Sequence, residues 1–229
     1  MRAYQQVLAR IEQDLLAGLI DVGGRLPSER ALAERYSVSR ASVREAIKVL
    51  EAMGVIRTNV GSGPDAGAVV ISEPSAPIGA ALRWHLASRH LPAGDLVDAR
   101  VLIESWAVRS AAGNPHAPEL SMARELLQAM EDPKLVAEQF LDLDTRFHVA
   151  LADAAGNSVI STIMAAMRRG VQSYVTAAVD RLADWPAMAE RLRREHSQVL
   201  DAVERGDGCS AQRAITAHIT DFYTDTGVG

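Results

Sequence analysis

The sequence predicts a mostly α-helical protein in two parts, a small N-terminal domain and a larger all-α C-terminal domain. Aromatic residues make up 4% of the chain, whereas Ala and Leu are abundant, which favours helix over sheet. The first seventy residues show the order helix, helix, turn, helix and two short strands. Beyond residue 77 the apolar residues follow helical spacing, so we expect no further sheet.

The N-terminal elements are marked by apolar spacing and by residues that begin helices. Helices are expected over 4–17, 29–36 and 39–53, and strands over 55–60 and 68–71. Ser28 and Ser39 are placed to cap the second and third helices, and a glycine-rich turn joins the strands. This order is that of a winged helix-turn-helix, which we assign to residues 1–72.

The second part follows a proline-containing stretch, 73–77, which we expect to be a stiff linker without helix because it holds two prolines. Residues 78–229 are then expected to form a helical bundle. The expected helices cover 78–90, 95–113, 118–131, 133–155, 158–181, 185–206 and 208–225.

Charge is distributed unevenly along the chain. The net charge is −5, yet residues 25–57 hold seven basic and four acidic side chains. A basic segment within an otherwise acidic protein is typical of a DNA-binding module joined to another domain.

The sequence also predicts where the protein resides. Its single cysteine, Cys209, cannot form an internal disulfide, which fits a reducing compartment. We find no signal-peptide pattern at the N-terminus. The longest uncharged run, 154–167, is too short to span a bilayer. We therefore expect a soluble, cytoplasmic protein with no membrane partner.

The helix that begins at Ser39 has the features of a DNA recognition helix. Arg40 and Arg44 lie one turn apart, on the side opposite the apolar stripe, and arginine pairs with guanine or with phosphate. Ser39 and Ser42 carry short hydroxyls suited to phosphate contact. A basic amphipathic helix can also be only a solvated surface, but the helix order and the glycine-rich turn favour DNA binding.

The same segment resembles the GntR family of regulators. The matching residues are Leu26-Pro27-Ser28-Glu29-Arg30-Ala31-Leu32-Ala33, Val38-Ser39-Arg40-Ala41-Ser42-Val43-Arg44-Glu45-Ala46 and Leu50-Glu51-Ala52-Met53-Gly54-Val55-Ile56. The resemblance implies that Arg30 is a further DNA contact. It also implies that the wing turn Gly61-Ser62-Gly63 reaches a groove or the DNA backbone.

Four polar residues of the C-terminal part lie on apolar stripes. Asp144 and His148 are one turn apart on one helix, and His196 and His218 lie on the last two. A lone histidine on an apolar face is more often a hydrogen-bonded core residue, and an Asp-x-x-x-His pair is more often a surface pair. Buried polar groups need partners, however. The four together predict a divalent metal site, with Zn²⁺ the first candidate and Ni²⁺ or Mn²⁺ the alternatives.

The C-terminal half resembles the FCD branch of the GntR family over nearly its whole length. The matching residues are Asp95-Leu96, Ala99-Arg100, Glu104, Asp144-x-x-Phe147-His148, Ala154-Ala155-Gly156-Asn157, Glu195-His196, Gly206-Asp207 and His218. The resemblance implies metal binding by the aspartate and the three histidines, and an organic-acid effector whose carboxylate meets Arg100. We also assign Asn157 to the effector site. The alternative for Arg100 is an internal salt bridge with Glu104, one turn away.

These features lead to one hypothesis and two rivals. The hypothesis is a homodimeric repressor that binds palindromic double-stranded operator DNA and responds to a small carboxylate bound next to the metal. Segments 61–64 and 182–186 are similar to those of actinobacterial lactate-responsive repressors, which suggests lactate or a related acid. One rival is a metal-dependent enzyme acting on a small carboxylic acid, although we find no nucleophile or general-base motif. The other is a regulator whose metal is purely structural.

Overall fold

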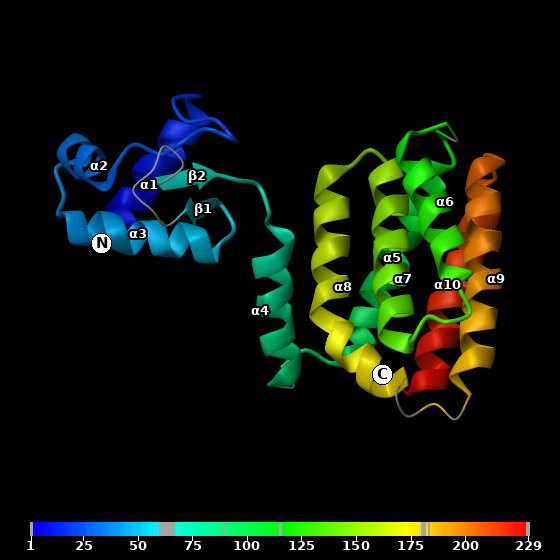
Figure 1. The fold of residues 1–229 in the computed structure, drawn as a ribbon. Helices are drawn as coiled ribbons and strands as arrows, with labels where there is room; N and C mark the ends of the chain where they lie inside the picture. Colours follow the sequence, from blue (N-terminus) through cyan, green and yellow to red (C-terminus); the bar gives the residue numbers. More distant parts are fainter. Residues whose placement is uncertain are drawn as a thin grey trace. The chain divides into compact units, whose positions relative to one another are not determined.

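A computed structural model describes residues 2–59, 67–88, 90–114, 116–179, 182 and 184–227, apart from the side chains of Ala93 and Ser173. The chain divides into two units, Met1–Pro77 and Ile78–Gly229. The first combines helices with one antiparallel pair of strands, and the described part of the second is helical (Figure 1). The predicted fold class, a winged helix-turn-helix plus an all-α bundle, is confirmed.

The first unit has the predicted order of elements. They are α1 (Ala3–Leu16), α2 (Glu29–Tyr36), α3 (Arg40–Ala52), β1 (Ile56–Asn59) and β2 (Gly67–Val70). The strands pair with Ile56 opposite Val70 and Asn59 opposite Gly67. The core contains Val7 and Ile11 of α1, Leu32 of α2, Val43, Ala46 and Leu50 of α3, and Ile56 and Val70 of the strands.

The turn between α2 and α3 fixes how α3 presents its N-terminal end. Ser37 adopts a left-handed backbone conformation with φ 55°, which ends α2. Ser39 caps α3, because its hydroxyl accepts a hydrogen bond from the Ser42 amide at 3.1 Å. Gly54, with φ +70°, follows α3, and a Cβ there would lie 2.7 Å from the Glu73 carbonyl oxygen. That position therefore requires glycine.

The second unit is a bundle of helices. They are α4 (Ser75–Ala87), α5 (Ala93–Ala111), α6 (Glu119–Met130), α7 (Ala137–Ala154), α8 (Ser158–Val179), α9 (Trp185–Glu204) and α10 (Gly208–Thr226). Helix α7 packs against α5, α6 and α8, and α10 packs against α5 and α9. Polar residues on the inner faces of these helices are therefore brought together. None of the helices in the described part of the chain has the length and apolar character needed to cross a membrane.

Two helices, α4 and α7, begin more than two residues away from the predicted position. The expectation that 73–77 excludes helix is wrong, because α4 begins at Ser75 and Pro77 lies within its first turn. Proline is tolerated there because an amide N–H in the first turn has no helical partner. Helix α7 begins at Ala137 rather than at residue 133. Before it, Asp132 accepts a hydrogen bond from the Lys134 amide at 2.9 Å and forms a turn.

Candidate metal centre and DNA-binding face

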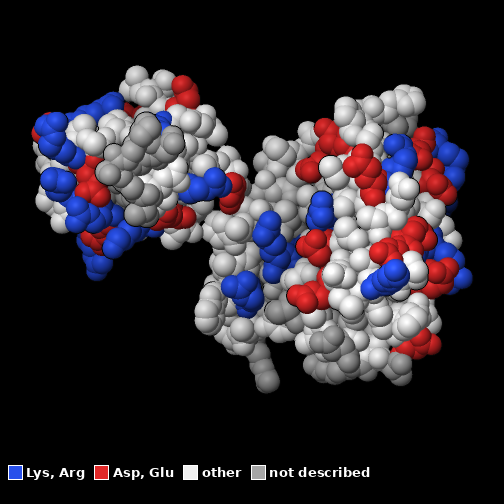
Figure 2. Space-filling view, viewed as in Figure 1, with Lys and Arg blue, Asp and Glu red and all other residues white. Residues whose placement is uncertain are grey.

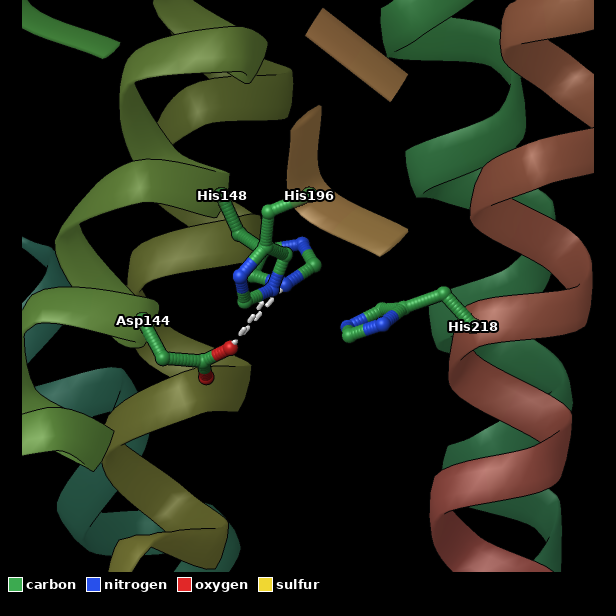
Figure 3. Close-up of side chains that lie close together, drawn as sticks. All are labelled: Asp144, His148, His196 and His218. Atoms are coloured by element: carbon green, nitrogen blue, oxygen red, sulfur yellow. Dashed lines mark ion pairs between the residues drawn. The ribbon is translucent and has the colours of Figure 1, made fainter. Parts of the chain in front are cut away.

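Four polar side chains meet inside the helical unit. Asp144 and His148 lie one turn apart on α7, His196 comes from α9 and His218 from α10, and all four are buried. Their side chains point toward one another (Figure 3), and one ligand atom from each lies within 4.8 Å of the others. The structure therefore brings together the four residues that the sequence predicts as metal ligands.

Aromatic rings pack closely around these side chains. Phe147 lies between the two ligands of α7 in sequence, and its ring centroid is 4.8 Å from that of His196. Phe140 lies one turn before Asp144, and its ring meets Trp185 edge-on at 5.4 Å. Both phenylalanines are fully buried. A tightly packed wall of this kind restricts the rotamers of the polar residues that lie among it.

Two further carboxylates contact the outer nitrogens of the imidazoles. Glu104 of α5 lies against His148 Nδ1, and Glu195 Oε2 lies 2.8 Å from His218 Nδ1. A carboxylate on one ring nitrogen fixes the orientation of the ring and leaves the other nitrogen for a metal. Both glutamates are among the residues that resemble the FCD branch, but the sequence gives neither a role at the histidines, because both contacts depend on packing between helices.

The inner nitrogens are the best test of whether the site fits a metal ion. His196 Nε2 lies 3.0 Å and His148 Nε2 lies 3.4 Å from Asp144 Oδ1. Within the described residues, however, neither nitrogen of His148 or of His196 has a partner with hydrogen-bond geometry. The contact of His148 Nδ1 with Glu104 is close but does not have that geometry. Buried polar atoms are rarely left in this state.

A divalent cation would satisfy one nitrogen of each ring, the Nε2 atom that faces Asp144. Ligand bonds of about 2.1 Å place donors on opposite sides of an ion about 4.2 Å apart, so the cluster needs only a small contraction to hold one. Three imidazoles and one carboxylate form a donor set suited to Zn²⁺, Ni²⁺ or Mn²⁺. The residues present therefore fit a metal ion.

The electrostatics of the cluster favour the protonation states that bind a metal. Burial lowers the pKa of His196, and burial together with the neighbouring His196 and His148 lowers the pKa of His218 well below its ordinary value. For Asp144, burial alone raises the pKa, but Arg168 and His148 outweigh it and hold the pKa well below its usual range. Neutral imidazoles and an ionised carboxylate are the forms that coordinate a cation.

The lowered histidine pKa values predict that the metal-free helical unit loses stability in mild acid. The ordinary pKa of histidine is 6.5, so below that pH the unfolded chain binds more protons than the folded one. The stability present above pH 6.5 is then lost as the pH falls toward the folded values, by at most about 1.4 kcal/mol per pH unit for each histidine.

Urea unfolding at several pH values, followed by tryptophan fluorescence, measures this slope. The three tryptophans, Trp84, Trp106 and Trp185, all lie in the helical unit, so the signal reports that unit alone. The variant His218→Gln should lose its share of the slope between pH 6.5 and pH 5. An unchanged slope in that variant would contradict a depressed pKa for His218.

A cavity beside the cluster has two arginines in its wall. It is lined by Arg100, Asp144, Arg168 and His218, by the polar side chains Thr145 and Gln172, and by apolar side chains of α7, α8 and α10. Its volume is about 20 Å³. That is room for one or two water molecules. A larger molecule would enter only with movement of the wall.

Arg100 lies in this wall, and its guanidinium already has two partners. Its Nε donates to Glu104 Oε1 at 2.7 Å and its Nη1 donates to the Tyr223 hydroxyl at 2.8 Å. Burial alone raises the pKa of Glu104, but Arg100 and His148 outweigh it and lower the pKa. The internal salt bridge is therefore present, and it does not remove Arg100 from the cavity.

Arg168 of α8 is a site residue that sequence analysis does not identify. It is 5% exposed, and its guanidinium pairs with Asp144 Oδ2. A signal for it was present in the sequence, because Arg168 shares a helical stripe with Met164, Val171 and Val175, which are buried. Arg168 is thus a charged residue on an apolar stripe, a pattern that predicts a buried group in need of a partner.

Asn157, in contrast, is not brought to the cavity. It is exposed at the N-terminus of α8, where its side-chain oxygen accepts hydrogen bonds from the amides of Val159 and Ile160 at 3.1 and 3.2 Å. It is not among the described residues that line the cavity. Its place in the chain is explained by helix capping, and nothing in this geometry assigns it to an effector.

The predicted recognition residues lie at the exposed N-terminal end of α3. The side chains of Arg40 and Arg44 are 63% and 57% exposed, and both contact Glu29 of α2. Arg44 donates to both Glu29 oxygens, at 3.1 and 2.8 Å. Figure 2 shows Lys and Arg side chains gathered on the N-terminal unit, with acidic ones among them. Exposed arginines at a helix N-terminus have the placement that major-groove docking needs.

The other predicted DNA contacts are placed as follows. Arg30 is exposed on α2 and pairs with Glu34 at 3.1 Å. The hydroxyls of Ser39 and Ser42 lie 2.9 Å apart within the cap of α3, so capping already engages both. The wing residues Gly61, Ser62 and Gly63 lie outside the described residues.

A winged helix-turn-helix joined to a helical domain with a buried polar cluster defines a class of two-domain transcription regulators. The comparisons agree. The chain matches the family model for bacterial regulatory proteins of the gntR family over residues 3–64 and the FCD domain model over residues 95–221. The chain therefore belongs to the GntR family and carries its FCD domain, and it is a DNA-binding transcription regulator of that type.

Individual relatives support the same assignment. The HTH-type transcriptional regulator LutR of Bacillus subtilis is 30% identical over 89% of this chain and 92% of LutR. The Glc operon transcriptional activator of Escherichia coli is 29% identical over 93% of this chain and 84% of the activator. A solved structure of Streptococcus agalactiae GntR shares the fold, with a TM-score of 0.68 and 23% identity over 95% of this chain and 97% of that one.

Proposed function

We propose that operator binding by this chain is controlled by a small organic acid that binds next to a divalent metal ion, with Zn²⁺ the first candidate. The observation that carries the proposal is the buried cluster of Asp144, His148, His196 and His218 beside a cavity that contains Arg100. Four protein donors leave up to two positions on an octahedral ion. A 2-hydroxy acid can fill both while its carboxylate approaches a guanidinium.

The name of one relative supports the same class of effector. An E. coli protein that is 30% identical over 97% of this chain is named, provisionally, as the regulator of the L-lactate dehydrogenase operon. We therefore propose lactate or a related 2-hydroxy acid for this chain. When bound, the metal would supply a positive charge and open coordination positions. The residues of the chain would orient the acid and exclude water.

The regulator is proposed to bind as a homodimer to a palindromic operator and to act as a repressor. Two α3 helices related by a twofold axis would then meet two half-sites. An acid that favours one arrangement of the helical domains changes operator affinity, and the operator changes acid affinity by the same factor.

Fluorescence anisotropy with labelled operator DNA tests the control of binding. Zinc-loaded protein should release the operator when L-lactate is added, and protein stripped of zinc should not respond. If zinc raises the melting temperature but no acid changes operator affinity, the metal is structural and the proposal fails. Turnover of the acid by the zinc-loaded protein would instead favour an enzyme.

The recognition helix gives a separate prediction. Arg40→Ala should weaken operator binding by about 1–3 kcal/mol, because an arginine that pairs with a base carries a contribution of this size. Gel shifts at fixed salt measure the loss. Arg205→Ala, which removes the same charge from an exposed position at the end of α9, is the matched control and should bind normally. Equal affinities for both variants would remove Arg40 from the DNA contacts.

A further inference from the structure

The charges around the cavity restrict the effector more closely than its coordination chemistry does. Four ionised groups are buried there, Arg100, Glu104, Asp144 and Arg168. They form two pairs, Arg100 with Glu104 and Arg168 with Asp144. Glu195, on the outer side of His218, is only partly buried and shares Arg191 with Asp225, at 3.4 and 2.6 Å. When the imidazoles are in the neutral form that coordinates a metal, the four buried charged groups of the metal-free site therefore sum to no net charge.

A divalent cation in this site would add two positive charges that no buried carboxylate of the described residues balances. The charge of a bound ion is often the largest in a site and has to be included in the count. Uncompensated buried charge is costly. A ligand that brings two negative charges would restore neutrality, whereas a monoanion would do so only if binding also released a proton.

Arg168 is placed to receive the second negative charge. Asp144 Oδ1 faces the imidazoles of His148 and His196, whereas Oδ2 faces the guanidinium of Arg168. A metal held by Oδ1 would therefore share the Asp144 carboxylate with Arg168. Among the described residues Asp144 is the one hydrogen-bond partner of Arg168, although a guanidinium has five N–H donors. Arg168 also lines the cavity together with Arg100.

We propose that the effector is a dianion, a 2-hydroxy acid with a second carboxylate, and that Arg168 is the residue that selects it. One carboxylate and the hydroxyl would occupy the metal. The second carboxylate would pair with the guanidinium of Arg168. Planar arginine makes charge-assisted contacts of this kind well. The inference rests on the proposed function, since it assumes both the metal and an organic acid, and it narrows the class of 2-hydroxy acids to those with a second carboxylate.

Isothermal titration calorimetry of the zinc-loaded full chain tests the inference with matched acids. L-malate and L-lactate differ by one carboxylate, as do tartronate and glycolate. We expect each dianion to bind at least about tenfold more tightly than its monoanion, the size of one charge-assisted contact. Titrations in two buffers of different ionisation enthalpy should show no net proton release on binding malate. Lactate binding as tightly as malate, or tight lactate binding with release of one proton, would overturn the proposal.

Two neighbouring arginines provide a variant and its control. Arg168→Gln should lose at least about tenfold in malate affinity and change lactate affinity less than threefold. Arg169→Gln removes the same charge from the exposed adjacent position and should change neither. An equal loss for both acids in Arg168→Gln would overturn the selecting role. If Arg168→Gln does not fold, the ratio of the malate and lactate affinities of the wild-type protein still tests whether the effector is a dianion.

Zinc binding is measured separately, by metal analysis of the dialysed wild-type protein. A wild-type chain that holds no zinc would defeat the proposed function and this inference together. A zinc-loaded wild type that binds both acids equally would defeat the inference alone and leave the proposed function standing.

Discussion

Addition of Zn²⁺ to the metal-free protein is expected to raise the free energy of unfolding of the helical unit by about 3–4 kcal/mol, at free zinc 100 to 1,000 times the dissociation constant. The reason is that the four ligands are assembled only in the folded bundle, on helices α7, α9 and α10. Urea unfolding followed by tryptophan fluorescence measures the change, since Trp185 packs on Phe140 beside the cluster.

Variants of two histidines separate ligation from a general effect of zinc. His218→Ala removes one donor and should abolish most of the zinc-induced stabilisation. His116→Ala removes an exposed histidine outside the cluster and should leave the effect intact. If both variants respond to zinc like the wild type, the ion binds elsewhere and the four residues are not its ligands.

The winged domain was predictable because its signals are local. Capping serines at Ser28 and Ser39, the glycine at Gly54 and the apolar spacing of α3 each depend on a few neighbouring residues, and each holds in the structure. The start of α4 was missed for the opposite reason. Proline is not tolerated in the interior of a helix, but it is tolerated in the first turn. The residue at which α4 begins depends on how this helix packs, since its Gly79 lies against α8.

The metal ligands were predictable because a polar residue on an apolar stripe is visible in sequence. Asp144, His148, His196 and His218 each break such a stripe, and each is buried. Arg168 breaks one too, but a lone arginine in a helix is usually exposed, so the signal is weak without a partner. Its partner Asp144 is 24 residues away on another helix, and only the fold brings the two together.

The carboxylates behind the imidazoles could not be predicted for a related reason. Glu104 contacts Arg100 within its own helix, which sequence spacing suggests, but it also contacts His148 on α7. Arg100 in turn reaches Tyr223, 123 residues away. Long-range contacts of this kind follow from the packing of α5 against α7 and α10. These contacts join separate polar residues into one connected network. The effects of mutating its members on stability should therefore not be additive.

Glu104 connects two members of that network, Arg100 of its own helix and His148 of α7. Glu104→Gln should destabilise the metal-free helical unit by about 3–5 kcal/mol, because it leaves the guanidinium of Arg100, which is 2% exposed, as an uncompensated buried charge. A loss of this size is a large part of the total stability of a domain. The same change removes the carboxylate that orients His148, so zinc affinity should also fall by about 10- to 100-fold.

Urea unfolding and zinc competition with a chromogenic chelator measure the two losses on the same samples. Glu204→Gln is the matched control, because Glu204 pairs with Arg124 at the surface, where both side chains are solvent-accessible. Breaking that pair should cost less than about 1 kcal/mol and leave zinc affinity unchanged. Equal losses of unfolding free energy for the two variants would mean that burial does not increase the contribution of the Arg100–Glu104 pair to stability. A stability loss without a loss of zinc affinity would mean that Glu104 anchors Arg100 but does not orient His148, and the site would then depend on Asp144 and Glu195 to hold its ligands in place.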